Sequence, residues 1–138
     1  MISLSFFVLF LLTLALASHA GDGAVTARHG MVVAQEVRAA DATDAEAERN
    51  MEIGRYYIGR HDYVSALARF RTVVTRYRSS PGVAEALARL TKTYLALGVT
   101  SEAQRAAAVL AREFPNSPWS AEAANAVRAA GLEPVENP

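Results

Sequence analysis

The sequence pair with the clearest potential for chemistry is His61 followed by Asp62. A histidine beside a carboxylate can serve as a general base, but only when a nucleophile and an oxyanion-stabilising group accompany it. The chain offers neither, and it has no glycine-rich phosphate loop and no metal-ligand spacing. The remaining histidines, His19 and His29, lie near the N-terminus. We therefore predict no catalytic residue, no metal site and no cofactor, and we interpret His61 as a solvated turn residue.

A second chemical feature is the basic stretch that contains Arg69, Arg71, Arg76 and Arg78. Helical spacing puts Arg69 and Arg76 on one face, away from the apolar side of the same segment. This face is either a solvated polar surface or a docking surface for an acidic partner, because a guanidinium group can grip a carboxylate at two points. RNA binding is the weakest interpretation, since the aromatic residues fall on the core side and could not stack with bases.

Composition limits the remaining function classes. Fourteen basic residues balance fourteen acidic ones, so nothing in the net charge favours a nucleic-acid binder. The 138 residues contain no cysteine, which excludes within them a disulfide, a thiolate zinc site, a catalytic thiol and a lipidated cysteine. Hydrophobic residues make up 51% of the chain, enough for a packed core in one domain.

The elements that must position these residues repeat along the chain. The stretch YRSSPGVAEA at 77–86 returns as FPNSPWSAEA at 114–123, 37 positions later. In the same register, Ala47-Glu48, Ala84-Glu85 and Ala121-Glu122 align. A period in this range is typical of a solenoid built from one supersecondary unit.

Local signals predict that this unit is a helical hairpin. Ser80 and Ser117 are expected to be N-caps with proline at the first helical position. Gly98 is expected to end one helix, and Thr100 to cap the next. The apolar periodicity predicts an all-α chain of five helices, near 44–59, 63–77, 82–97, 100–114 and 118–130.

Small and large residues follow the tetratricopeptide pattern. Gly54 and Ala66, and Ala103 in the next copy, would let paired helices approach closely. The two copies of the pattern are Gly54, Tyr57, Ala66, Phe70 and then Tyr94, Ala103, Ala107, Pro115. The pattern departs from its strict form at Thr91, which replaces the small residue, and at Ala107, which replaces the aromatic.

We predict four segments: a signal peptide over 1–20, a disordered linker over 21–43, a repeat domain over 44–131, and a frayed tail over 132–138. Small residues at Ser18 and Ala20 favour cleavage after Ala20, and an uncleaved membrane anchor is the alternative. In a tetratricopeptide fold a concave groove usually holds an extended or helical peptide, and plain surface is the alternative for each of its residues. The residues expected there are Glu48, Met51, Arg55, Glu85, Lys92 and Glu122.

The sequence segments MEIGRYY, ALARF and YLALG, at their spacing, resemble the BamD (YfiO) family, and the resemblance covers about residues 48–125. That family consists of outer-membrane lipoproteins that help to assemble β-barrel proteins. The resemblance implies a non-catalytic scaffold that binds other subunits of the β-barrel assembly machinery. It also implies partner contacts around Arg60 and Arg69, and Arg76 shares the helix face of Arg69.

Two departures from the family keep alternatives open. The family's lipidated cysteine is missing, which predicts a periplasmic protein that reaches the outer membrane through its partners. Only about two and a half of the family's five repeats are present. Residues 23–36, GAVTARHGMVVAQE, resemble the mature start of γ-glutamyltransferases. The alternatives are a generic periplasmic repeat adaptor, or a truncated or fused reading frame with an enzyme-like start.

Overall fold

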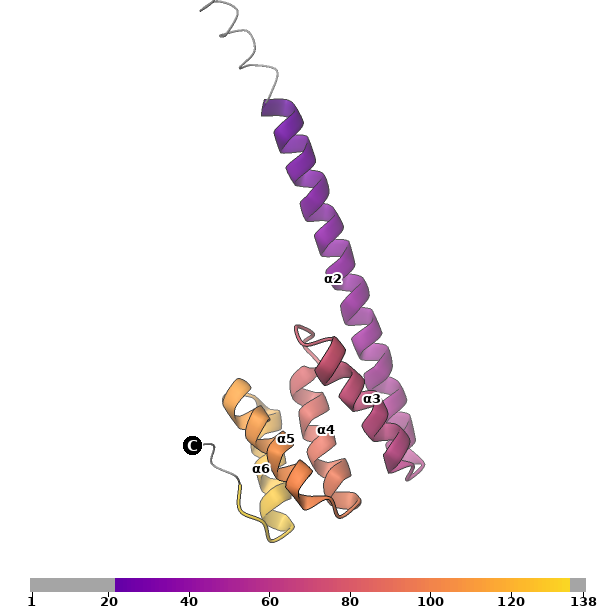
Figure 1. Cartoon of the computed structure of the whole chain (residues 1–138), viewed down its shortest axis with the longest axis vertical. Coiled ribbons are helices and arrows are strands. Elements are labelled where there is room, and N and C mark those ends of the chain that lie inside the picture. The colour runs from indigo at the N-terminus through magenta and orange to yellow at the C-terminus, as the bar shows by residue number, and fades with distance from the viewer. Residues whose placement is uncertain (1–21, 135–138) are drawn as a thin grey trace, which may run out of the picture. The chain divides into compact units, whose positions relative to one another are not determined.

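A computed structural model describes residues 22–134, and every regular element in that range is an α-helix. The helices are α2 (Asp22–Gly59), α3 (Tyr63–Arg76), α4 (Val83–Ala96), α5 (Thr100–Glu113) and α6 (Pro118–Ala129) (Figure 1). The chain divides after Asp41, and the hairpins lie in the unit that starts at Ala42. The prediction of an all-α helical-hairpin fold is confirmed.

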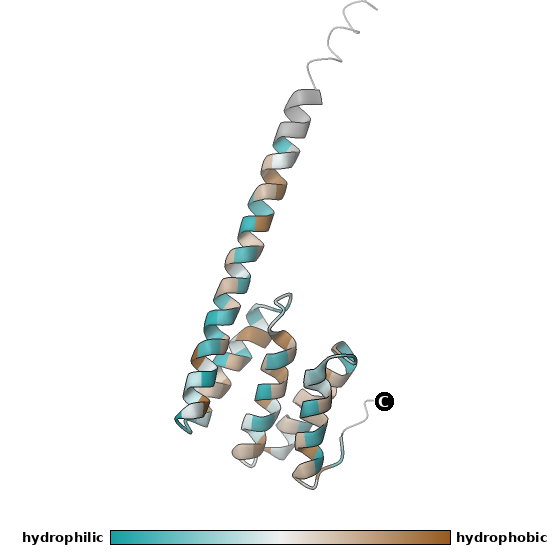
Figure 2. Ribbon diagram, turned by 180° about the vertical axis from the view of Figure 1, so that it is seen from behind, coloured by the Kyte–Doolittle hydropathy of each residue, from teal (hydrophilic) through white to brown (hydrophobic). Residues whose placement is uncertain are grey.

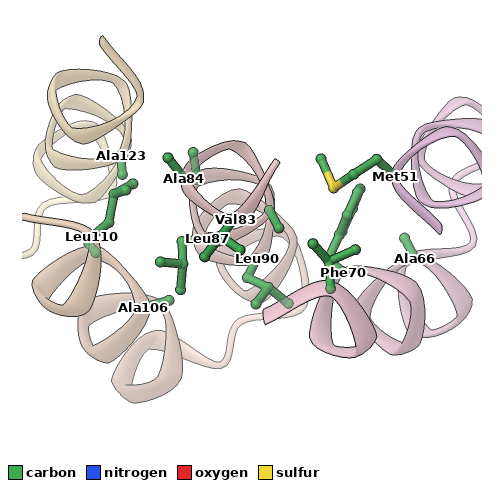
Figure 3. Packing of buried hydrophobic residues seen from close by; sticks show 14 of the residues in the cluster. Met51, Ala66, Phe70, Val83, Ala84, Leu87, Leu90, Ala106, Leu110 and Ala123 are labelled. Carbon is green, nitrogen blue, oxygen red and sulfur yellow. The ribbon is translucent and has the colours of Figure 1, made fainter. Parts of the chain in front are cut away.

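Helix α4 is the centre of this unit. It contacts α3, α5 and α6, and α5 also contacts α6. Figure 3 shows α4 between the α2–α3 pair on one side and the α5–α6 pair on the other. Hydrophilic and hydrophobic residues alternate around these helices (Figure 2), so each can bury one face and solvate the other. The buried residues of α4 are Val83, Ala84, Ala86, Leu87, Ala88, Leu90, Thr91 and Thr93.

The first hairpin closes through a glycine, as the repeat pattern predicts. A Cβ atom built on Gly54 would lie only 2.5 Å from the ring of Phe70. Phe70 and Ala66 are both fully buried on α3. Because the glycine has no side chain, the Phe70 ring packs directly against the backbone of α2. Any larger residue at position 54 would have to displace that ring.

The turns inside the two hairpins are equivalent. His61 and Gly98, 37 positions apart, both adopt positive φ angles, of 59° and 73°. Glycine adopts this left-handed conformation without strain, and histidine is one of the residues that tolerate it better than most. Asp62 then caps α3, because its side chain accepts a hydrogen bond from the Ser65 N–H. His61 therefore has a structural task as the turn residue.

The predicted helix caps were correct in one place and wrong in two. Ser117 caps α6 as expected, with Pro118 in the first turn. The cap of α4, however, is Gly82, because the Ser80 hydroxyl and carbonyl are used in a turn that delays regular helix until Val83. Similarly, the cap of α5 is Val99, and Thr100 is its first helical residue.

The first described helix begins at Asp22, so the prediction of a disordered linker up to residue 43 was wrong from that residue onward. The segment from 22 to 43 contains no proline, and it is rich in alanine and in long side chains that favour helix. The apolar side chains of Met31, Val32, Val33 and Val37 are exposed, so these residues show none of the burial that would have marked a packed helix.

The extent of the repeat domain, 44–131, and of the tail remain predictions. The predicted signal peptide, with Ala20 and His19, lies outside the described residues. Within residues 22–134, the helices are too short or too polar for any of them to cross a membrane.

Candidate partner-binding surfaces

The His61–Asp62 pair is not arranged as a catalytic base. The carboxylate of Asp62 accepts from the Ser65 N–H at 3.1 Å, and its hydrogen bonds with Ser65 lower the pKa of Asp62. The Nδ1 atom of His61 lies 3.1 Å from the Tyr63 hydroxyl instead. In the part of the chain that the structure describes, no group of three histidine or acidic side chains could hold a metal ion.

Most of the residues predicted to line the groove are brought together, but they pair with one another. Arg55 of α2 binds Glu48 on its own helix and Glu85 of α4, the latter at 3.2 Å. Glu85 also accepts from Arg89 at 3.1 Å. Burial alone would lower the pKa of Arg55, but the hydrogen bonds and charges of Glu48 and Glu85 raise it overall.

The pairing continues onto the last helix. Lys92 of α4 forms a salt bridge with Glu122 of α6, and the guanidinium of Arg89 lies 5.8 Å from the centre of the Trp119 ring. A cation at this distance from an indole face is attracted to it. We call this set the ion-pair ladder: Glu48, Arg55, Glu85, Arg89, Lys92 and Glu122. The charges of the ladder are satisfied within the set. Its salt bridges join α2 to α4 and α4 to α6.

Met51 was expected to line the groove, and this placement was wrong. Its side chain is fully buried and belongs to the core. A Cβ on Gly82 would lie 3.6 Å from Met51, so this side chain fills the space over the turn before α4. The helical period puts Met51 between the buried Ala47 and Gly54, which is the core side of α2.

A different situation holds for Arg60, Arg69 and Arg76, which we call the basic hairpin surface. All three are exposed, and none forms a salt bridge with a described residue. The guanidinium of Arg60 lies 5.7 Å from the centre of the Tyr56 ring. Arg69 borders a hollow of about 180 Å³ between α2 and α3 that is also lined by Tyr57.

The sequence did not point to some of the residues beside these two surfaces. Tyr56, which is 59% exposed, adds apolar area beside Arg60, and Val64 of α3 is 70% exposed. Tyrosine and arginine are the residue types that most often dominate binding at protein interfaces. Arg89 and Trp119 were also missed, although Arg89 stands four residues after Glu85, a spacing that favours ion pairs on a helix.

The stacked hairpins define a helical-repeat protein. Residues 33–110 match the YfiO family, described as outer membrane lipoprotein, and the chain belongs to that family. It is 36% identical over 95 residues to the outer membrane protein assembly factor BamD of Caulobacter vibrioides, covering 69% of this chain and 31% of that protein.

Two further relatives carry the same name. The chain is 37% identical to BamD of Rickettsia prowazekii over 76 residues, covering 55% of this chain and 30% of the relative. It is 35% identical to BamD of Neisseria meningitidis over 88 residues, covering 59% and 33%. The chain thus spans about a third of the length of these relatives. No solved structure matches it at a significant level.

Proposed function

We propose that this chain is a non-catalytic scaffold in outer-membrane protein assembly, and that its basic hairpin surface binds another subunit of the β-barrel assembly machinery. The family supports the process, because the relatives are named as assembly factors. The absence of an assembled base at His61 and Asp62 supports a role in binding over one in catalysis. The cellular place proposed with this role is the periplasm, at the outer membrane through partners.

The observation that carries the proposal is the contrast in charge pairing. The carboxylates of the ion-pair ladder neutralise its cations, whereas Arg60, Arg69 and Arg76 are exposed and form no salt bridge with a described residue. The exposed guanidinium group of Arg60, over the ring of Tyr56, combines charge with apolar area. Such a surface suits a partner that presents carboxylates around an apolar patch.

Co-purification tests this proposal. The tagged chain should carry a barrel-assembly subunit from the envelope of the native cells, and Arg60→Glu with Arg69→Glu should lose it. The matched control is Arg112→Glu with Arg128→Glu, which makes the same charge change on exposed arginines of α5 and α6. Equal recovery of the subunit by both double variants, or no subunit with the unmodified chain, would contradict the proposal.

A further inference from the structure

A groove with an apolar floor separates α3 from α5. Its larger part has a volume of about 600 Å³, and its apolar lining comes from three helices. A second part of about 240 Å³ shares Val74 and Val109 with the first and continues to Phe114. The two parts therefore form one groove. The apolar residues of the larger part are Val74 of α3, Leu90 and Tyr94 of α4, and Ala106 and Val109 of α5.

The two rims of the groove differ in charge. On the α5 rim, Glu102 pairs with Arg105 at 2.7 Å, and Glu113 pairs with Arg112 at 2.9 Å. On the α3 rim, Arg71 and Arg78 form no salt bridge with a described residue, and the Arg78 Nε atom donates only to the Thr75 carbonyl. The acidic groups on the rims are therefore already neutralised, and two cations are left to meet a partner.

This groove is separate from the basic hairpin surface. Arg71 follows Arg69 by two residues, which is about 200° around a helix of 3.6 residues per turn. Arg69 borders the hollow on the α2 side of α3, and Arg71 borders the groove on the α5 side. A partner could therefore occupy one surface and leave the other free.

We propose that the groove binds one amphipathic, acidic α-helix of a partner protein. An extended peptide usually gains affinity by adding to a sheet edge, and residues 22–134 contain no strand. A helix instead needs apolar anchors at spacings of three and four, facing an apolar channel. Arg71 of α3 lines the larger part of the groove, and Arg78, just beyond the end of α3, lines the smaller part, so carboxylates near both ends of one face of the partner helix would meet both.

The test is a displayed library of helical peptides selected on the full chain. The peptides are 18 residues long with fixed leucines at i, i+4, i+7 and i+11, and the flanking positions vary among Glu, Gln and Lys. We expect Glu to be enriched beside the leucines. Selection on the Arg71→Glu and Arg78→Glu double variant should reverse the preference to Lys.

Titration of the best acidic peptide measures how much each substitution changes its binding affinity. The double variant should weaken its binding at least tenfold, and Thr75→Trp, which fills the groove from an exposed rim position, should do the same. Arg128→Glu, at an exposed position of α6 that lines neither part of the groove, should leave binding unchanged, and helical circular dichroism checks the fold of each variant. Failure to enrich any peptide, the same flank preference on both proteins, or a dimer of the chain that the double variant abolishes would overturn the proposal.

Discussion

The two complete hairpins fill the space between their paired helices with side chains of opposite size. In the α2–α3 hairpin, Gly54 lies against the ring of Phe70. At the equivalent positions, 37 residues later, the α4–α5 hairpin has Thr91 and Ala107, both buried. In the first hairpin the larger side chain, Phe70, thus comes from the second helix. In the second hairpin the larger side chain, Thr91, comes from the first helix. Two departures from the repeat pattern that look independent in the sequence therefore compensate each other.

The hairpins also differ in surface charge. Position 76 on α3 holds an arginine without a carboxylate partner among the described residues, and position 113, its equivalent on α5, holds a glutamate paired with Arg112. A shared backbone thus carries two different surfaces. The packing of each hairpin can be tested by stability, and the surfaces by binding.

The largest expected effect is that of Phe70→Ala. Because Gly54 opposite has no side chain, nothing can collapse into the space that the ring leaves, and we expect a loss of about 3–5 kcal/mol in the free energy of unfolding. Urea unfolding followed by circular dichroism measures it. Val64→Ala, on the same helix but exposed, should change stability by no more than about 0.5 kcal/mol. Similar losses for the two variants would contradict the packing described for the first hairpin.

Ala66→Leu and Ala103→Leu come next. Both alanines are fully buried at equivalent positions, so a larger side chain must force the helices apart, at roughly 1–3 kcal/mol in each hairpin. Arg71→Ala removes an exposed charge and should cost less than about 0.5 kcal/mol. If thermal unfolding showed only one leucine variant to be destabilised, the two hairpins would not close in the same way.

Arg55→Met should have a smaller effect. Arg55 joins α2 to α4, but its side chain is 33% exposed, so solvent screening keeps the expected loss near 0.2–1 kcal/mol. Lys92→Met removes the corresponding link between α4 and α6 and should behave alike. Both losses should shrink when unfolding is repeated at 1 M salt. A salt-independent loss would indicate that packing of the arginine stem, and not its charge, holds α2 on α4.

The smallest effect is the pH dependence at Asp62. Hydrogen bonds with Ser65 lower the folded-state pKa of Asp62 below its unfolded value of about 3.9. Its contribution to stability is therefore fully present above pH 4 and is lost as the pH falls through the lower folded pKa. The stability gap between the unmodified chain and Asp62→Asn should narrow over that interval in thermal unfolding. A gap that stays constant down to pH 2 would contradict this role of the carboxylate.

Periodicity was sufficient to predict the helical hairpins, because Leu87, Leu90 and Tyr94 recur at helical spacing and Gly98 ends the pattern. It was also sufficient to predict that Gly54 lets the two helices of the first hairpin approach closely. It could not place the start of α4, since Ser80-Pro81 and Ser117-Pro118 are the same residue pair. Only the first pair is followed by a turn through Gly82 before the helix begins. Nor could it show that α2 starts at Asp22, because residues 30–41 are exposed and give no buried apolar face.

For the candidate surfaces, the sequence predicted where the charged side chains lie better than it predicted which of them form salt bridges. It put Glu48, Arg55 and Glu85 near one another, but it could not show that they bind each other across two helices. Met51 was misplaced because a groove residue and a core residue can stand one helical turn apart. The charge imbalance between α3 and α5 depends on which carboxylates are in reach, and that is a property of the folded chain.

The two hairpins are two copies of one structural unit, in which the larger side chain has been exchanged between the paired helices. The direct test rewrites the first hairpin as the second, with Gly54→Thr, Phe70→Ala and the double variant compared by urea unfolding. Each single change should destabilise the chain, and the double variant should recover part of the loss, with a coupling energy on the order of 0.5–3 kcal/mol. Losses that simply add would contradict the claim, because the two positions would then not share one space.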